Sequence, residues 1–400
     1  MRIGMMADAY KPHVSGITNV ISLSKQYLEK AGYEVYVFTF GGGDYVDDEP
    51  NIIRTRGVPL VDTGLYLSGR HSTEAQKVLQ KMDIIHVHHP FTSGQLAIRY
   101  SRAQGIPLVF TNHTRYDLYA QAYLPMVPDA VGDAVLRAYM PAFCKACDLV
   151  IAPSAGLKDV LINLGVESNI AVIPNGVDVH PFQTVGKPIS RHELGFDDND
   201  ILLTYMGRVG PEKNLAFLLR AFSGIAKTYD NVNLLILGDG PERENLEDRV
   251  RVMGLSHRVK FTGMIPYSEL PAYMAAADAF VTASVSEVHP LSVIEALASG
   301  LPVVGIQSPG VGDTVEDGVT GYLAPEEDLA VFTAKISRII TDHDSRKKMS
   351  QTAREVAMIY AIENTTQIMI DCYQKLYLEY TGKRINFFRR LTRPFRRTKV

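Results

Sequence analysis

Short apolar runs alternate with amphipathic segments along the first half of the chain. The apolar runs occupy residues 3–6, 35–40, 84–87, 108–111, 149–152 and 170–173. Segments with helical spacing lie between several of them, at residues 16–30, 94–104 and 154–164. Short apolar runs separated by helices of about ten residues or more indicate parallel strands joined by crossover helices.

The same alternation begins again in the second half. Apolar runs occupy residues 201–206, 233–237, 259–262, 280–282 and 302–305, and helical segments occupy 214–228 and 291–299. Turn-forming residues at 174–178 and a polar stretch at 186–200 interrupt the pattern between the halves. Because 400 residues exceed what one hydrophobic core usually holds, two domains are expected.

We therefore predict an α/β protein with two doubly wound, Rossmann-like domains that face each other across a cleft. The predicted domains are residues 1–182 and 183–359, and a C-terminal helix at about 360–382 is expected to pack back on the first. In open parallel sheets, ligands bind beyond the carboxyl ends of the strands. Functional residues should then lie directly after predicted strands.

The first candidate is Gly16, which follows the first strand and a loop of residues 8–15 and begins a helix. A glycine there lets the backbone approach an anionic group, and the amides of the helix N-terminus favour phosphate. Ordinary βαβ units also contain single glycines at such turns. The G-x-G-x-x-G fingerprint is absent from this loop, which argues against a dinucleotide-dependent dehydrogenase.

Two cations follow the first strand of the second half. Arg208 and Lys213 lie in the loop 207–214, directly after the run 201–206. A diphosphate leaving group gains negative charge as its bond to a sugar breaks, and two fixed cations stabilise such a transition state. The alternative interpretation is an exposed loop with solvated charges.

Two carboxylates follow another strand of that half. Glu287 falls in the loop after the run 280–282, and Glu295 lies eight positions further on, inside the helical segment. Eight residues are a little over two helical turns, so both carboxylates can face one groove. The backbone amides of Leu291 and Ser292 form a helix N-terminus suited to phosphate. Glutamates at this spacing are also common on surface helices.

In this order, these motifs resemble those of the large family of retaining, GT-B-fold glycosyltransferases that carry a Glu–seven residues–Glu motif. The resemblance covers essentially residues 1–380. The matching pieces are Val14-Ser15-Gly16, His113, 173–178, Gly207-Arg208, 212–214, 238–241, the Glu287/Glu295 pair and 316–321. Ser15 departs from the pattern, because a second glycine is common there.

The resemblance implies roles for the donor-side residues. Arg208 and Lys213 would bind the diphosphate, and Gly16 would approach it from the other domain. Glu295 would bind the ribose hydroxyls, and Glu287 would bind the hydroxyls of the donor sugar. The full set predicted to bind the nucleotide-sugar is Gly16, Arg208, Lys213, Met264, Ile265, Glu287, Leu291, Ser292 and Glu295.

The resemblance also implies the chemistry. His113, after the run 108–111, would contact the sugar from the acceptor side, although by itself it is equally an ordinary loop histidine. The residues predicted to act in catalysis are His113, Glu287, Arg208 and Lys213. Family members keep the anomeric configuration without an evident protein nucleophile, and the departing phosphate helps to deprotonate the incoming hydroxyl. Neither a metal ion nor another cofactor is expected.

Two acidic clusters and a cysteine pair suggest other chemistry. Residues 47–49 and 198–200 superficially resemble D-x-D metal sites, but both lie in turn-rich loops where solvated side chains are expected. Cys144 and Cys147 form a C-x-x-C pair, which raises a redox or zinc hypothesis. No second pair or histidine cluster accompanies them, so we expect structural cysteines and a reducing compartment.

The segment 383–399 is the one strongly basic part of the chain. It holds eight of the 41 Lys and Arg residues and no acid, so that 33 basic residues remain against 44 acidic ones and give the body a charge of −11. Phe387, Phe388, Leu391 and Phe395 would lie on one helical stripe, as in interfacial membrane anchors. A solvated basic tail, or one that binds nucleic acid nonspecifically, is the alternative.

Residues 88–93 and 111–123 bear on the acceptor. Their His-His-Pro-Phe-Thr-Ser and His-Thr-x-Tyr-x-x-Tyr sequences resemble those of family members that glucosylate diacylglycerol, although the aromatic side chains are equally suited to core packing. We therefore predict a hexosyltransferase that moves glucose from a UDP-sugar to a lipid acceptor such as diacylglycerol. The alternatives are a soluble glycosyltransferase that acts on a sugar or other small acceptor, and a non-catalytic nucleotide-sugar-binding protein.

The expected location follows from the same features. No run of 18 apolar residues that would span a membrane occurs, and the first residues resemble a strand rather than a signal peptide. We expect a cytoplasmic protein that associates peripherally with the inner face of the cell membrane. The segment 383–399 would bind the anionic lipid surface, and no specific nucleic-acid partner is expected.

Overall fold

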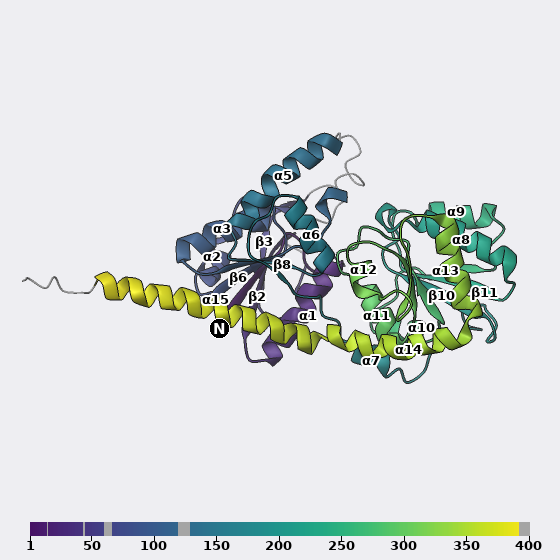
Figure 1. The fold of residues 1–400 in the computed structure, drawn as a ribbon. Helices are drawn as coiled ribbons and strands as arrows, with labels where there is room; N and C mark the ends of the chain where they lie inside the picture. Colours follow the sequence, from purple (N-terminus) through teal and green to yellow (C-terminus); the bar gives the residue numbers. More distant parts are fainter. Residues whose placement is uncertain (14, 43–44, 60–65, 119–128, 392–400) are drawn as a thin grey trace, which may run out of the picture.

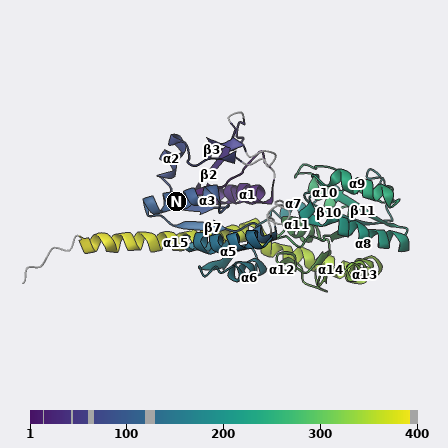
Figure 2. The ribbon, with the colours of Figure 1, turned by 90° about the horizontal axis from the view of Figure 1, so that it is seen from above.

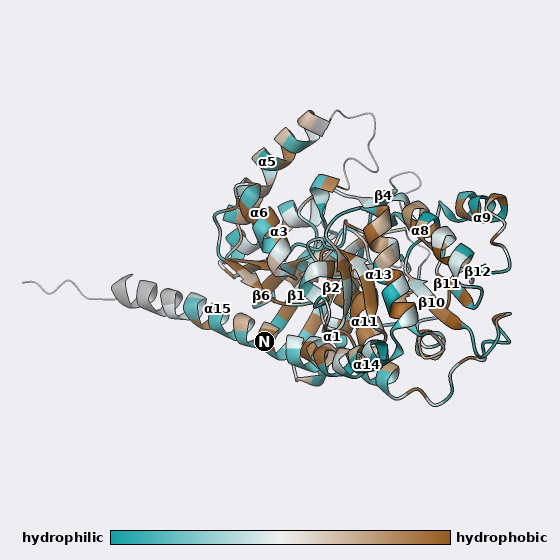
Figure 3. Ribbon diagram, turned by 45° about the vertical axis from the view of Figure 1, so that its right-hand side comes forward, coloured by the Kyte–Doolittle hydropathy of each residue, from teal (hydrophilic) through white to brown (hydrophobic). Residues whose placement is uncertain are grey.

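The computed structural model describes residues 1–13, 15–42, 45–59, 66–118 and 129–391, and the side chains of residues 383–391 are outside the description. The described residues form two sheets of parallel strands. The two sheets lie side by side, and each has helices on both faces (Figures 1 and 2). Hydrophobic residues concentrate in the strands and on the helix faces turned toward them (Figure 3). The predicted α/β class with two doubly wound, Rossmann-like halves is confirmed.

The first sheet has seven parallel strands. In spatial order they are β3 (Ile52–Arg56), β2 (Glu34–Gly41), β1 (Arg2–Met6), β6 (Ile84–Val87), β7 (Leu108–Thr111), β8 (Leu149–Ala152) and β9 (Ile170–Val172). Two short strands, β4 (Val58–Pro59) and β5 (Tyr66–Leu67), pair with each other in antiparallel fashion and form a separate two-stranded sheet.

Helices cover both faces of this sheet. One face packs against α1 (Gly16–Lys30) and α15 (Ile362–Leu391). The other face packs against α2 (Thr73–Leu79), α3 (Thr92–Gln104), α5 (Asp129–Lys145) and α6 (Ala155–Asn163). Successive residues of a strand point to opposite faces, so Met5 joins the first of these cores and Met6 the second.

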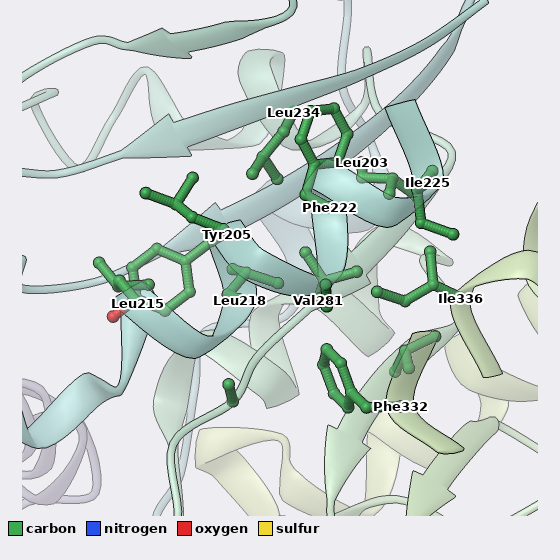
Figure 4. Close-up of a cluster of buried hydrophobic side chains, with 14 of the residues drawn as sticks. Leu203, Tyr205, Leu215, Leu218, Phe222, Ile225, Leu234, Val281, Phe332 and Ile336 are labelled. Carbon is green, nitrogen blue, oxygen red and sulfur yellow. The ribbon is translucent and has the colours of Figure 1, made fainter. Parts of the chain in front are cut away.

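The second sheet has six parallel strands. In spatial order they are β12 (Val259–Phe261), β11 (Val232–Leu237), β10 (Ile201–Met206), β13 (Ala279–Val281), β14 (Val303–Ile306) and β15 (Gly321–Ala324). One face packs against α8 (Leu215–Thr228), α9 (Arg243–Val252) and α13 (Leu329–Thr341). Figure 4 shows this core, in which Phe222 and Phe332 lie among aliphatic side chains of β10, β11 and β13.

The opposite face of the second sheet is covered by five helices of the described residues. Four of them are short, namely α7 (His180–Gln183), α10 (Leu270–Met274), α11 (Leu291–Ser299) and α12 (Val311–Thr314), and the fifth is the longer α14 (His343–Ala357). Single 3₁₀ turns precede α8 (η1, Pro211–Lys213) and follow α14 (η2, Met358–Tyr360). Val177, Val179 and Phe182 belong to this core, so the chain has entered the second half by residue 177. The domain boundary near residue 183 stays a prediction.

Helix α15 returns from the second half to the first (Figure 1). The two connections between the halves run side by side, because Val177 donates its amide hydrogen to the Tyr360 carbonyl and accepts one from Ile362. Ile370, Tyr373 and Leu376 of α15 are then buried against the first sheet. No helix among the described ranges has both the length and the apolar character needed to cross a bilayer.

Two strands at sheet edges escaped the hydrophobic pattern. β3 contains two arginines among five residues and is largely half-exposed, as an edge strand permits. β15 begins with Gly321, where an added Cβ would lie 1.9 Å from the Val303 carbonyl oxygen. Glycine is therefore needed there for close strand approach, and a four-residue run with a glycine gives only a weak strand pattern.

Candidate active site

The order of the strands reverses once in each sheet. The reversal falls between β1 and β6 in the first sheet and between β10 and β13 in the second. Crevices open at the carboxyl ends of strands at such switch points, and ligands bind there. The loops that follow these four strands are 7–15, 88–91, 207–214 and 282–290, which we call the switch-point loops. Most of the predicted site residues lie in them or directly beside them.

The loop 207–214 is held by contacts that glycines permit. An added Cβ on Gly238 would lie 2.0 Å from the Gly207 carbonyl oxygen, and one on Gly240 would lie 2.4 Å from that of Val209. Beneath the loop, the buried Tyr205 hydroxyl donates a hydrogen bond to the Arg208 carbonyl at 3.0 Å. The position of the Arg208 backbone is therefore fixed by its neighbours in the fold.

Lys213 and Glu287, which the sequence placed in separate loops, meet in the structure. The Lys213 Nζ atom lies 2.7 Å from Glu287 Oε1, and the two side chains are 16% and 21% exposed. The hydroxyls of Ser284 and Ser286 donate to the Glu212 carbonyl at 3.4 and 3.0 Å. These bonds hold the two switch-point loops of the second half together, so the ion pair is part of a fixed surface that remains open to solvent.

Arg208 lies at the more exposed side of the same loop. Its side chain is 51% exposed and its Nη1 atom lies 3.8 Å from Glu212 Oε1. Burial and then the charge of Arg208 lower the pKa of His13, which shows that the loop 7–15 of the first half comes close to this arginine. Sequence reasoning missed His13 as a site residue, and its place in the loop before Gly16 was the only available signal.

Glu295 is buried within α11. Its side chain accepts a hydrogen bond from the Tyr267 hydroxyl at 2.8 Å, and the residue is 4% exposed. Burial raises the pKa of Glu295 to about 7, and the hydrogen bond from Tyr267 opposes this shift. No hydrogen bond or ion pair within the described ranges joins Glu295 to Glu287, so their predicted common groove stays a prediction.

The raised pKa of Glu295 makes stability depend on pH in a defined direction. Between about 4.5 and 7 the folded protein holds a proton on Glu295 that the unfolded chain has lost, so the free energy of unfolding falls as pH rises through this window. Glu295→Gln removes this penalty. We expect its stability relative to the wild type to increase by up to about 3 kcal/mol between pH 4.5 and 8.

Denaturant unfolding at a series of pH values measures this difference. Glu269→Gln is the matched control, because it makes the same substitution at an exposed glutamate directly before α10. A difference between Glu295→Gln and the wild type that stays constant across the pH series would contradict the prediction.

Two helix N-termini lie at the switch points. Leu291 and Ser292 begin α11 and are half-buried, and no side chain caps this helix. Gly16 begins α1, where the Ser15 hydroxyl accepts the Thr18 amide hydrogen at 3.2 Å. The serine that departs from the family pattern thus serves as the helix N-cap. An added Cβ on Gly16 would meet nothing within 4 Å in the described part of the chain, so packing does not require this glycine.

The remaining candidates occupy two further loops. His113 follows β7, is half-buried, and its Nε2 atom lies 2.9 Å from Nδ1 of His88. Met264 and Ile265 follow β12; Met264 is 67% exposed and Ile265 is half-buried. No hydrogen bond among the described residues links these loops to the Lys213–Glu287 pair.

Hydrogen bonds join the two halves, and one set of them involves a switch-point loop. The Asn175 side-chain amide donates to the His289 carbonyl at 3.1 Å, and its backbone amide donates to His289 Nδ1 at 3.3 Å. The Gly156 amide donates to Asp313 Oδ2 at 2.6 Å. His289 lies two residues beyond Glu287. The Asn175–His289 hydrogen bonds therefore tie the loop 282–290 to the connection between the halves.

The acidic and cysteine clusters have structural partners. Asp47 forms an ion pair with Arg54, and Asp200 accepts a hydrogen bond from Asn233. Cys144 is buried near the end of α5 and is not disulfide-bonded to Cys147, and burial raises the pKa of both thiols. Within the described ranges, no group of three or more His, Cys, Asp and Glu side chains is arranged to hold a metal ion.

Comparison with known proteins identifies the family. Residues 186–356 match the model of glycosyl transferases group 1, and residues 14–180 match that of glycosyltransferase family 4. Over 344 residues the chain is 33% identical to an alpha-monoglucosyldiacylglycerol synthase of Streptococcus pneumoniae, with 82% of this chain and 77% of that protein covered. A synthase of the same name from Acholeplasma laidlawii is 30% identical over 337 residues, with 80% and 84% covered.

Solved structures show the same fold at lower identity. Sucrose-phosphate synthase of Thermosynechococcus elongatus has a TM-score of 0.76 at 22% identity, with 94% of this chain and 99% of that chain covered. Anabaena HepE in complex with UDP has a TM-score of 0.74 at 21% identity, with 94% and 100% covered. Two facing Rossmann-like halves of this kind define a GT-B glycosyltransferase.

The chain belongs to the group 1 family of glycosyl transferases. It is a hexosyltransferase by the same relationship, and the resemblance to diacylglycerol glucosyltransferases is confirmed by the two synthases. The roles of the individual site residues stay predictions.

Proposed function

We propose that this enzyme transfers glucose from UDP-glucose to diacylglycerol at a membrane surface, with retention of the anomeric configuration. The observation that carries this proposal is the 33% identity with an alpha-monoglucosyldiacylglycerol synthase along most of both chains. The half-exposed Lys213–Glu287 pair at the second switch point supplies the charges that such a donor requires.

The donor's diphosphate is assigned to cations and helix N-termini. Lys213 and Arg208 stabilise the negative charge that builds on the phosphate as the bond to the sugar breaks. The uncapped N-terminus of α11 and the N-terminus of α1 at Gly16 add backbone donors from the two halves. Glu287 holds the Lys213 ammonium in place at 2.7 Å and can accept hydrogen bonds from sugar hydroxyls with its remaining lone pairs.

The sugar transfer itself needs no base from the protein. The acceptor oxygen forms its bond to the anomeric carbon on the face from which the diphosphate leaves, and the hydroxyl proton passes to the departing phosphate. Positive charge on the sugar in the transition state is balanced by the Glu287 carboxylate. Glu295, which lies buried beside Tyr267, is assigned to the ribose hydroxyls, and the exposed Met264 with Ile265 to the base.

The basic segment 383–399 is proposed to bind anionic lipid at the inner face of the cell membrane. Residues 392–400 lie outside the described residues, as do the side chains of 383–391, so the support is the charge in the sequence. The backbone of α15 continues as a helix to Leu391. Tyr119 and Tyr123, proposed for the acceptor side, also lie outside the described residues.

A product screen tests this proposal. Purified protein is incubated with UDP- or GDP-sugars and either diacylglycerol in vesicles or soluble sugars, and products are identified by mass. We expect one hexose to be added to diacylglycerol from UDP-glucose. Turnover with soluble acceptors alone would contradict the lipid acceptor. If the protein neither transfers nor hydrolyses any of the donor sugars, the result would instead support a nucleotide-sugar-binding protein.

A further inference from the structure

Three histidine rings lie one on another beneath the acceptor side of the first half. His86 belongs to β6 and His88 follows it directly, so both side chains point to the same side of the strand. Their ring centroids are 4.2 Å apart, and those of His88 and His113 are 5.2 Å apart with the planes inclined by 20°. His86 and His88 are each 2% exposed, whereas His113 is half-buried.

The inner end of this histidine stack (His86, His88 and His113) is fixed by two hydroxyls. His86 Nδ1 lies 2.5 Å from the Tyr373 hydroxyl, and His86 Nε2 lies 2.7 Å from the Thr111 hydroxyl. Tyr373 is fully buried and belongs to α15, so the C-terminal helix holds one end of the stack. Both nitrogens of His86 are thereby satisfied.

At the outer end of the stack, one hydrogen bond joins the rings of His88 and His113. His88 Nδ1 and His113 Nε2 are 2.9 Å apart, so one of them donates and the other accepts. Burial is the main cause that lowers the pKa of both rings well below the usual range, so both are neutral near pH 7. A neutral imidazole has one N–H, and the donor in this pair therefore has a bare second nitrogen.

The second nitrogen of His88 indicates which ring donates. His88 Nε2 is buried and has no hydrogen-bond partner within the described ranges. If His113 donated, His88 would carry its hydrogen on this Nε2 atom and bury an N–H without a partner. Among backbone groups, a buried N–H without a partner is rarer than a buried acceptor without one, and we apply the same preference to the imidazole nitrogens. The arrangement in which His88 Nδ1 donates to His113 Nε2 leaves only a bare acceptor buried.

We propose that His88 is a positioning residue, which donates to His113 and thereby fixes the His113 ring with its hydrogen on Nδ1. His113 then offers a hydrogen-bond donor, and not a general base, to an oxygen of the sugar or of the acceptor. His113 Nδ1 makes no hydrogen bond with the part of the chain that the structure describes. This inference rests on the proposed contact between His113 and the substrates.

The stack also links the C-terminal helix to the site. Tyr373 fixes the ring of His86, and His86 lies against His88. Docking of α15 on the first sheet therefore helps to hold His88, which donates a hydrogen bond to His113, in position. The same helix continues toward the basic segment 383–399.

Two variants of His88 separate the hydrogen bond from the ring. His88→Asn retains an N–H donor near the position of Nδ1, whereas His88→Phe retains a flat buried ring and removes the donor. We expect kcat/KM for sugar transfer to fall about tenfold in His88→Phe and to stay within about threefold of the wild type in His88→Asn. Equal losses in both variants at equal thermal stability would overturn the proposal.

The tautomer of His113 provides a readout that does not depend on turnover. In protein labelled with ¹⁵N-histidine, the nitrogen shifts and couplings of each ring report which atom carries the hydrogen, and the His113 signal is assigned by its loss in His113→Gln. We expect the Nδ1–H form in the wild type and in His88→Asn, but not in His88→Phe. A wild-type ring with its hydrogen on Nε2 would overturn the inference, even if sugar transfer is found. Conversely, the Nδ1–H form supports it even if the proposed acceptor is wrong.

The link to α15 has a matched control on the same helix. Tyr373→Phe removes the hydroxyl that contacts His86, and Tyr380→Phe removes the hydroxyl that donates to Asp148 Oδ1 at 2.6 Å. Both hydroxyls tie α15 to the first sheet, but only Tyr373 contacts the stack. We expect a two- to fivefold loss of kcat/KM for Tyr373→Phe alone. Equal activity losses in the two variants would overturn the link.

Discussion

Lys213→Ala is expected to lower kcat/KM for sugar transfer by about a hundredfold or more. The ammonium of Lys213 lies at the carboxyl end of the second sheet, held at 2.7 Å from Glu287, where the proposed diphosphate gains charge. A cation held there needs no reorganisation in the transition state, so its removal costs more than the loss of a solvated charge. Steady-state kinetics with UDP-glucose measure the effect, which should fall mainly on kcat.

Lys335→Ala is the control for Lys213→Ala. Lys335 is also in the second half and forms an ion pair with Asp317 at 3.3 Å, but it belongs to α13 and lies outside the switch-point loops. Removal of the Lys335 side chain should leave kcat/KM within about twofold of the wild type. An exposed ion pair contributes at most about 1 kcal/mol, and this one lies outside the loops that are proposed to bind the sugar donor. Lys213→Ala with the wild-type melting temperature and less than a fivefold loss would show that this cation does not act on the leaving group.

Deletion of residues 383–400 is expected to abolish binding to anionic vesicles while donor hydrolysis persists. The segment holds eight cations, each of which contributes about 1 kcal/mol near an anionic surface, and the rest of the chain is acidic. The buried part of α15, at Ile370, Tyr373 and Leu376, lies before the deletion, so the fold should remain intact. Sedimentation with phosphatidylglycerol vesicles measures the binding.

A full-length variant with the eight basic residues of this segment replaced by glutamine separates charge from length. It should lose binding to the same extent, and binding of the wild type should weaken as salt is raised, because exposed charges are screened. Unchanged vesicle binding by the truncated chain would place the membrane contact elsewhere. Loss of binding in the truncated chain but not in the glutamine variant would assign the contact to the apolar stripe.

The ion pair of Lys213 and the burial of Glu295 affect how these two residues can bind the nucleotide-sugar. Lys213 already has an anionic partner, so the incoming diphosphate must share this ammonium with Glu287. Burial raises the pKa of Glu295 to about 7, so near neutral pH a part of these carboxyl groups still carries a proton before the nucleotide binds. Hydrogen bonds from ribose hydroxyls favour the charged form, and we expect the nucleotide to lower this pKa.

The sequence by itself determined the fold class and the order of the site. Strand and helix periods are local properties, so the alternation of β1, α1 and β2 and its return at β10 were visible without tertiary contacts. The rule that ligands bind at the carboxyl ends of parallel strands then placed Arg208 and Glu287 in loops, and Gly16 at a helix N-terminus, that do lie at the switch points. The edge strands β3 and β15 were missed, because arginines in one and a glycine in the other hide the pattern.

Only the tertiary structure decided how the side chains pair. Lys213 and Glu287 are 74 positions apart, Tyr267 and Glu295 are 28 apart, and His86 and Tyr373 are 287 apart. No local pattern encodes contacts of this kind, because they depend on the order in which strands enter a sheet and on where α15 returns. Burial is likewise a property of the assembled core. It raises the pKa of Glu295 and keeps the histidine stack neutral, whereas the sequence gives only an ordinary glutamate and three ordinary histidines.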